Sequence, residues 1–343
     1  MRDKDQAKKV GALAIVLAIL LRLILGAVFA DGDSIFSYPR LASFLISAET
    51  GRAPEQEQTQ PSESTEPSQE STEPSETTEP TEPTQPQLPV ERAIFTEEDA
   101  QYVSVNYGCK LRPDLTTLLT QELNWDLTGD EPTVLILHTH GTEAFMPTQD
   151  SQYEEFGGEF RTKDERYNML SIGDELTRLL TEAGISVIHD RTLHDLNDYN
   201  DSYDNSRVAV QEYLKKYPSI QLVLDLHRDA AEYQDGTQWA TSATVDGKPS
   251  AQVMLVVGTN ATGLNHPNWQ TNMALAEKLQ VAIHRVCPGV ERAINLRGSR
   301  FNHDLSPGAL IAEIGSAGNT HEEAMRAVPV LAEAIVSLVH GAN

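Results

Sequence analysis

The chain has 343 residues and a formal net charge of −25, with 51 acidic side chains against 26 lysines and arginines. This acidic balance argues against binding to nucleic acid, because the phosphate backbone requires a basic surface. The length is sufficient for two domains, but the composition changes sharply along the chain, so only part of it is expected to form a hydrophobic core.

An apolar segment near the amino terminus predicts a transmembrane helix. Residues 10–30 contain one charged side chain, Arg22, and are long enough to cross the hydrocarbon core of a bilayer as a helix. Basic residues precede this segment, so the positive-inside rule places residues 1–9 in the cytoplasm and the rest of the chain outside. A signal peptide cleaved after Ala30 is the alternative, but its apolar region would be unusually long. We expect an uncleaved anchor in the cytoplasmic membrane.

An acidic, proline-rich segment follows the predicted anchor. Residues 54–89 consist almost entirely of Glu, Pro, Thr, Ser and Gln, and no basic residue lies between Arg52 and Arg92. Such a segment has too little apolar surface to offset the entropy that ordering would cost. It predicts a disordered linker within an extracytoplasmic stalk of residues 31–91. Residues 92–343 then form the predicted catalytic domain.

Strand-like and helix-like segments alternate from residue 92 onward, which indicates an α/β domain. Strands are expected at 134–137, 185–188, 220–226, 241–245, 250–258 and 309–314. Helices are expected at 167–183, 206–216, 272–286 and 321–339. Asp246-Gly247 is a hairpin turn signal between two of the strands. We expect a single three-layer domain with a mixed, mostly parallel sheet.

Polar side chains that can bind a metal lie at the ends of three expected strands. His138 and His140 follow the first strand, His227 follows the third, and Glu313 lies near the end of the last. In open α/β sheets, ligands bind at the carboxyl edge of the strands. Two or three histidines together with carboxylates match the composition of a catalytic zinc site. The sequence therefore predicts Zn²⁺ at this edge.

The spacing of these residues indicates a ligand set. Glu143 follows His140 with the His-x-x-Glu spacing of zinc carboxypeptidases, whose three protein ligands leave a position for water. Period-two alternation is expected to place the imidazoles of His138 and His140 on one face. We expect His140, Glu143 and His227 to bind Zn²⁺, with His138 as the rival to His140. Glu313 is the expected base that deprotonates the water.

Arg228 and His138 complete the expected catalytic set. They are expected to stabilise the tetrahedral oxyanion or to bind substrate carboxylates. An ion pair of Arg228 with Asp225, Asp229 or another neighbouring acid is equally compatible with the sequence. A structural carboxylate is the alternative for Glu313, because an unpaired buried carboxylate would be costly.

Cys109 and Cys287 are the two cysteines of the chain. Their spacing does not resemble a metal site. A disulfide between them is compatible with an exported domain, since such bonds persist in oxidising compartments. The sequence leaves open whether they pair.

Six motifs follow one another along residues 130–343. They are H-T-H-G-T-E-A-F (138–145), Y-N-M-L-S-I-G-D-E-L (167–176), G-I-S-V-I-H-D-R-T-L-H-D (184–195), Y-N-D-S-Y-D-N-S-R (199–207), V-L-D-L-H-R-D-A (223–230) and F-N-H-D-L-S-P-G-A-L-I-A-E-I-G-S-A-G-N-T (301–320). In these motifs the chain resembles the stage II sporulation protein P family. It departs from the family at 301–304, where Phe-Asn-His-Asp replaces the frequent Tyr-Asn-Gln-Asp.

The resemblance implies a zinc-dependent peptidoglycan hydrolase with a fold like that of amidases and zinc carboxypeptidases. It implies cleavage of the amide between N-acetylmuramic acid and L-alanine, and of peptide crosslinks, at the septal and engulfing membrane during sporulation. Stage II sporulation proteins D and M are the implied partners. By comparison with the broader class of zinc muramoyl-amidases, Glu165, just ahead of the expected helix at 167–183, is the rival to Glu143.

Two other functions remain as alternatives to an amidase. One is a wall-binding scaffold that recruits other hydrolases and has no activity of its own. The other is a zinc carboxypeptidase that acts on stem peptides. The zinc content of the protein and the products released from cell wall distinguish the three.

Overall fold

The computed structural model describes residues 93–339, except 124, 159, 231–232 and 234–235. The expected cytoplasmic tail, membrane anchor and stalk lie outside the described residues. Within the described part, no helix combines the length and the apolar character that are needed to span a bilayer.

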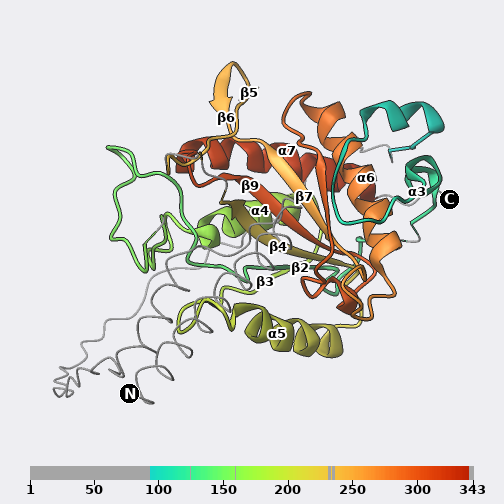
Figure 1. Ribbon diagram of the computed structural model, residues 1–343, viewed down its shortest axis with the longest axis horizontal. Coiled ribbons are helices and arrows are strands. Elements are labelled where there is room, and N and C mark those ends of the chain that lie inside the picture. The colour runs from blue at the N-terminus through green and yellow to red at the C-terminus, as the bar shows by residue number, and fades with distance from the viewer. Residues whose placement is uncertain (1–92, 124, 159, 231–232, 234–235, 340–343) are drawn as a thin grey trace, which may run out of the picture. The chain divides into compact units, whose positions relative to one another are not determined.

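A seven-stranded sheet organises the described residues (Figure 1). Its strands, in spatial order, are β1 (Val105–Gly108), β8 (Ile294–Arg297), β7 (Val253–Gly258), β9 (Ala309–Ser316), β4 (Leu222–Asp229), β2 (Val134–Leu137) and β3 (Val187–His189). Neighbouring strands are parallel except for β7 and β9, which are antiparallel. The prediction of an α/β fold with a mixed, mostly parallel sheet is confirmed. Because β2, β4 and β9 run in the same direction, their carboxyl ends meet at one edge.

Helices cover both faces of the sheet (Figure 1). One face carries α4 (Met169–Glu182), α6 (Trp269–Val286) and α7 (His321–Val339), and the other carries α5 (Ser202–Lys216). Successive side chains of each strand point to opposite faces of the sheet, so the apolar strands supply core residues to both layers of helices. Ile136 and Leu224 belong to the large core under α4, α6 and α7, whereas Leu135 and Val223 belong to the smaller core under α5. The expected three layers are present.

Several short elements were not predicted. They are η1 (Glu97–Tyr102), α3 (Leu115–Thr120), η2 (His303–Leu305) and strand β8, which lies between β1 and β7 in the sheet. The strand expected at 250–258 is two strands: β6 (Lys248–Ser250) pairs with β5 (Ala243–Val245), and β7 enters the large sheet. The hairpin signal is confirmed, because Asp246 and Gly247 both have positive φ, at 51° and 73°.

The two cysteines are free thiols. Cys287 follows α6, where its Sγ lies 3.5 Å from the carbonyl oxygen of Thr244. Cys109 directly follows β1 and lies beside Gly298. The structure therefore contains no disulfide between Cys109 and Cys287.

Candidate metal centre and catalytic site

The carboxyl edge of β2, β4 and β9 brings four of the predicted residues together. His227 and Glu313 are register partners on β4 and β9, so their side chains leave the sheet on the same face. His140 and Glu143 lie in the loop after β2. The rings of His140 and His227 are perpendicular, with centroids 5.3 Å apart. Nδ1 of His227 lies 3.6 Å from Oε2 of Glu143.

Buried polar atoms of this cluster lack partners. His140 is 7%, Glu143 5% and His227 4% exposed, and although Glu313 as a whole is partly accessible, its Oε2 is buried. Nδ1 of His140 and Oε2 of Glu313 have no hydrogen-bond partner among the described residues, whereas Nε2 of His227 lies 2.9 Å from Oδ1 of Asp225. Because buried polar atoms in proteins are normally paired, such a group of unpaired atoms indicates a place for a ligand.

The carboxylates favour a positive charge on the ring of His227. Burial alone would lower the pKa of His227, but Asp225 and then Glu143 and Glu313 raise it to about 10. Burial lowers the pKa of His140 to about 2, so its imidazole is neutral. Burial raises the pKa of Glu313 to about 8 and also raises the pKa of Glu143. The site thus combines surroundings that favour a cation with a neutral imidazole, the form that binds metals.

The donor types match those of a zinc site. His140, Glu143 and His227 offer two imidazole nitrogens and one carboxylate, as three-ligand catalytic zinc sites do. In the part of the chain that the structure describes, however, no group of three or more His, Cys, Asp or Glu side chains is arranged to hold a metal ion. The fit therefore rests on donor type and on the unpaired buried atoms, and the ligand set stays a prediction.

His138 lies on the opposite face of the sheet from His140, so the prediction that both imidazoles share one face is wrong. Strand β2 ends one residue before His138, and the alternation does not continue to His140. Nδ1 of His138 lies 3.2 Å from the Leu226 carbonyl oxygen, and its Nε2 lies 2.8 Å from Nε2 of His189. Since both nitrogens already have protein partners, the geometry favours His140 over His138 as a ligand and gives His138 no free atom for an oxyanion.

Two tyrosines hold the ring of His140 on the α5 side. Tyr199 stacks on it with centroids 4.1 Å apart and an interplanar angle of 6°. Tyr203, in the first turn of α5, meets it edge-on at 5.6 Å and 88°. Neither tyrosine was among the predicted site residues. Tyr203 lies in α5 but Tyr199 precedes the helix, so helical spacing gives no signal that would have grouped the two.

Arg228 points into the loop after β2. It is 5% exposed, and its Nε donates a hydrogen bond of 3.0 Å to the Ala144 carbonyl oxygen. Its backbone N–H donates to Oε2 of Glu143 at 3.2 Å, and its Nη1 lies 3.8 Å from Oε1 of the same carboxylate. Of the two predicted roles, these contacts favour the ion pair. The partner is Glu143 rather than Asp225 or Asp229, so Arg228 holds the loop that carries an expected ligand.

Glu165, the rival to Glu143, is on the surface. Its side chain is 58% exposed and forms an ion pair with Arg191. The Glu143 side chain is 6% exposed and lies beside His227. The geometry therefore favours Glu143 over Glu165 as the carboxylate ligand.

Comparisons with known proteins relate the chain to one family. The family model described as stage II sporulation protein P matches residues 38–336. Stage II sporulation protein P of Bacillus subtilis (strain 168) is 30% identical over 217 residues, which are 60% of this chain and 51% of that protein. The chain thus spans about half the length of this curated relative.

Solved structures of amidases are distantly similar to the chain. The CwlD amidase from Clostridioides difficile, in complex with the GerS lipoprotein, has a TM-score of 0.37 and 13% identity, covering 59% of this chain and 96% of that one. The N-acetylmuramoyl-L-alanine amidase AmiC2 of Nostoc punctiforme has a TM-score of 0.36 and 15% identity, covering 62% and 96%. These scores are too low to bear on function.

Proposed function

The chain belongs to the stage II sporulation protein P family, and we propose that it is a zinc-dependent peptidoglycan hydrolase that acts during sporulation. The proposed scissile bond is the amide between N-acetylmuramic acid and L-alanine, and peptide crosslinks are a further proposed substrate. The observation that carries the proposal is the cluster of His140, Glu143, His227 and Glu313, which gathers buried, unpaired donor atoms at one sheet edge.

The proposed zinc ligands are His140, Glu143 and His227. A zinc ion held there would polarise the amide carbonyl and lower the pKa of a water molecule. The protein's own contribution is to keep the two imidazoles perpendicular, 5.3 Å apart, beside a carboxylate. Tyr199 and Arg228 support this arrangement, because Tyr199 packs on the ring of His140 and Arg228 binds Glu143.

Glu313 is the proposed general base and acid. Register pairing places it next to His227, on the face that carries the expected ligands. Its Oε2 is buried and has no hydrogen-bond partner in the described part of the chain, so that oxygen has room to accept a proton. In amide hydrolysis the same carboxylate takes a proton from the attacking water and gives it to the leaving amine.

The proposal includes a location outside the cytoplasm. The apolar run at 10–30 and the basic residues before it support a single-pass anchor with a cytoplasmic amino terminus. The acidic segment at 54–89 supports a long tether between the membrane and the domain. The family resemblance supports the septal and engulfing membrane as the site of action, with stage II sporulation proteins D and M as partners.

A catalytically inactive scaffold that binds cell wall is the second candidate. The observation that favours it is that no three metal-binding side chains among the described residues are arranged to hold an ion. A scaffold needs no zinc, whereas the proposed hydrolase does.

The test measures zinc and products with the full chain. After loading with zinc and removal of excess metal, we expect one zinc per chain by elemental analysis. Digestion of peptidoglycan should free whole stem peptides that begin with L-alanine, as detected by mass spectrometry. The Glu313→Gln chain is the control, and it should keep its zinc but release little product. Release of terminal residues alone would indicate a carboxypeptidase. If the chain bound no zinc and released no products, the scaffold function would be favoured.

A further inference from the structure

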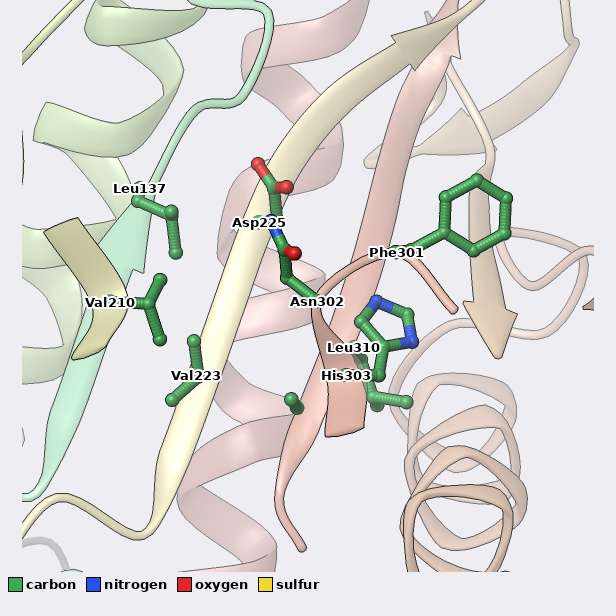
Figure 2. Close-up of a pocket in the computed structure, with 9 residues that line it drawn as sticks. Leu137, Val210, Val223, Asp225, Phe301, Asn302, His303 and Leu310 are labelled. Atoms are coloured by element: carbon green, nitrogen blue, oxygen red, sulfur yellow. The ribbon is translucent and has the colours of Figure 1, made fainter. Parts of the chain in front are cut away.

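Asp225 is a buried carboxylate that the predicted site did not include. It lies two residues before His227 on β4 and is 6% exposed. Together with Leu137, Val210 and Val223 it lines a small hollow between α5 and the sheet (Figure 2). In such apolar surroundings a carboxylate is stable only where hydrogen-bond donors compensate for the lost water.

The donors that compensate Asp225 come from the turn between the two histidines after β2. The Thr139 backbone N–H donates to Oδ1 of Asp225 at 2.7 Å, and the Thr139 hydroxyl donates to Oδ2 at 2.5 Å. The Thr139 hydroxyl also lies 2.8 Å from the Ser206 hydroxyl of α5. Because Thr139 directly precedes His140, these contacts fix the start of the His140 loop to β4.

Asp225 also contacts His227 itself. Its Oδ1 lies 2.9 Å from Nε2 of His227, while Nδ1 of the same ring lies 3.6 Å from Oε2 of Glu143. The contact brings a carboxylate oxygen within hydrogen-bond distance of the imidazole nitrogen, and it is an ion pair when the ring is protonated. A metal-binding imidazole usually presents its second nitrogen to a carboxylate or carbonyl, which fixes the tautomer. The carboxylate at Nε2 favours the proton there and leaves Nδ1, beside Glu143, for a metal.

We infer that Asp225 is a positioning residue of the zinc site, which orients His227 directly and His140 through Thr139. The inference rests on the proposed zinc-dependent function and adds to it the group that sets the distance between the two histidines. One carboxylate joins β4 to the loop after β2, and β4 and this loop supply the two imidazoles. Its loss should therefore weaken zinc binding without removing any ligand.

The experiment compares zinc affinity of full chains by competition with a chromogenic chelator. Asp225→Asn keeps the shape of the side chain but removes its charge, and we expect zinc to bind about 10–100-fold more weakly. Asp190→Asn is the matched control. Asp190 is likewise buried, accepts from the Thr192 N–H at 3.1 Å and hydroxyl at 2.7 Å, and lies 3.0 Å from His194. This variant should bind zinc like the unchanged chain.

A second pair of variants tests the route through Thr139. Thr139→Val removes the hydroxyl that donates to Asp225, whereas Thr139→Ser keeps it. We expect Val to weaken zinc binding and Ser to restore it. The visible absorption of bound Co²⁺, which reports ligand geometry, should change in Asp225→Asn and stay unchanged in Asp190→Asn.

Several results would overturn the inference. One is equal zinc affinity and an equal Co²⁺ spectrum in Asp225→Asn and the unchanged chain, and another is an equal loss of affinity in Asp190→Asn. If circular dichroism shows that Asp225→Asn does not fold, the Thr139 pair decides, and equal affinities of Val and Ser reject the inference. Failure of the proposed function looks different, because the unchanged chain then binds no zinc, and both proposals fall.

Discussion

The histidines on the two faces of the sheet at the end of β2 differ in whether their ring nitrogens have hydrogen-bond partners. On the α4 face, both nitrogens of His138 have partners, and its partner His189 lies 3.1 Å from an oxygen of Asp174. On the α5 face, Nδ1 of His140 and Oε2 of Glu313 are buried without hydrogen-bond partners in the described chain. A buried donor or acceptor that stays unpaired costs about 1–3 kcal/mol. The α5 face is therefore the one that gains from a ligand.

The α4 face is closed by close packing as well as by contacts. A Cβ atom at Gly173, in the middle of α4, would lie 2.6 Å from Nε2 of His138. Glycine inside a helix is less favourable than alanine by about 0.5–1 kcal/mol. The absence of a Cβ at Gly173 leaves room for the rings of His138 and His189, and this packing offsets the cost. Histidines two positions apart thus have different roles: His138 completes a packed interior, and His140 faces a site.

The largest expected effect is on catalysis at the α5 face, with zinc binding unchanged. Glu313→Gln should lower the rate of peptidoglycan cleavage by about 10²–10⁴-fold, because proton transfer by a positioned carboxylate is worth that much. Zinc content should not change, since Glu313 is not an expected ligand. The rate is measured from muropeptide release and the zinc by elemental analysis. Normal cleavage by this variant would rule out Glu313 as the base.

Removal of His140 and removal of His138 should have different effects. His140→Ala should weaken zinc binding by more than the roughly 10–100-fold expected for loss of a residue that only hydrogen-bonds to a metal ligand. His138→Ala should keep its zinc but be less stable by about 1–3 kcal/mol, because Leu226 and His189 lose their partner. Chelator competition and denaturant unfolding measure the two quantities. Loss of zinc in His138→Ala with retention in His140→Ala would invert the assignment.

Glu277 is an unpaired buried carboxylate outside the proposed zinc site, and it should affect stability instead of metal binding. Glu277 in α6 is fully buried, and neither carboxylate oxygen has a hydrogen-bond partner among the described residues. Burial raises its pKa from 4.5 to about 8. The folded state therefore holds the proton more tightly, and stability falls as pH rises through this window.

The variant Glu277→Gln removes this pH dependence. Above pH 8 it should melt higher than the unchanged chain, by about 2–4 °C for each kcal/mol gained, and below pH 4.5 the gain should vanish. Thermal unfolding followed by circular dichroism checks both conditions. An equal gain at both pH values would mean that the effect is not the charge of Glu277.

The smallest effect is expected at the rival ligand. Glu165→Gln removes an exposed ion pair with Arg191, so stability should change by no more than about 0.5 kcal/mol. Zinc affinity should be unchanged, whereas Glu143→Gln should lose it. If Glu165→Gln lost zinc and Glu143→Gln kept it, the carboxylate assignment would have to be exchanged.

Most of the fold followed from sequence periodicity. The strand at 134–137 and the helix at 321–339 have the expected bounds, and α4 begins two residues later than expected because Asn168 caps it by accepting from the Leu170 N–H. The strand expected at 250–258 breaks because Ala251 and Gln252 donate to the Glu323 carbonyl and the Thr241 hydroxyl instead of to a strand. Long-range hydrogen bonds of this kind leave no periodic signal in the sequence.

The sequence by itself determined the kinds of donor and the sheet edge at which they lie, because apolar runs that end in His or Glu deliver these side chains to the ends of buried strands. Only the tertiary structure decided which donors stay unpaired. The partners of His138 are 88 and 51 residues away in the chain, and Asp225 binds a threonine 86 residues away. Such partners come together only when the sheet assembles, and they divide the two histidines after β2 between its two faces.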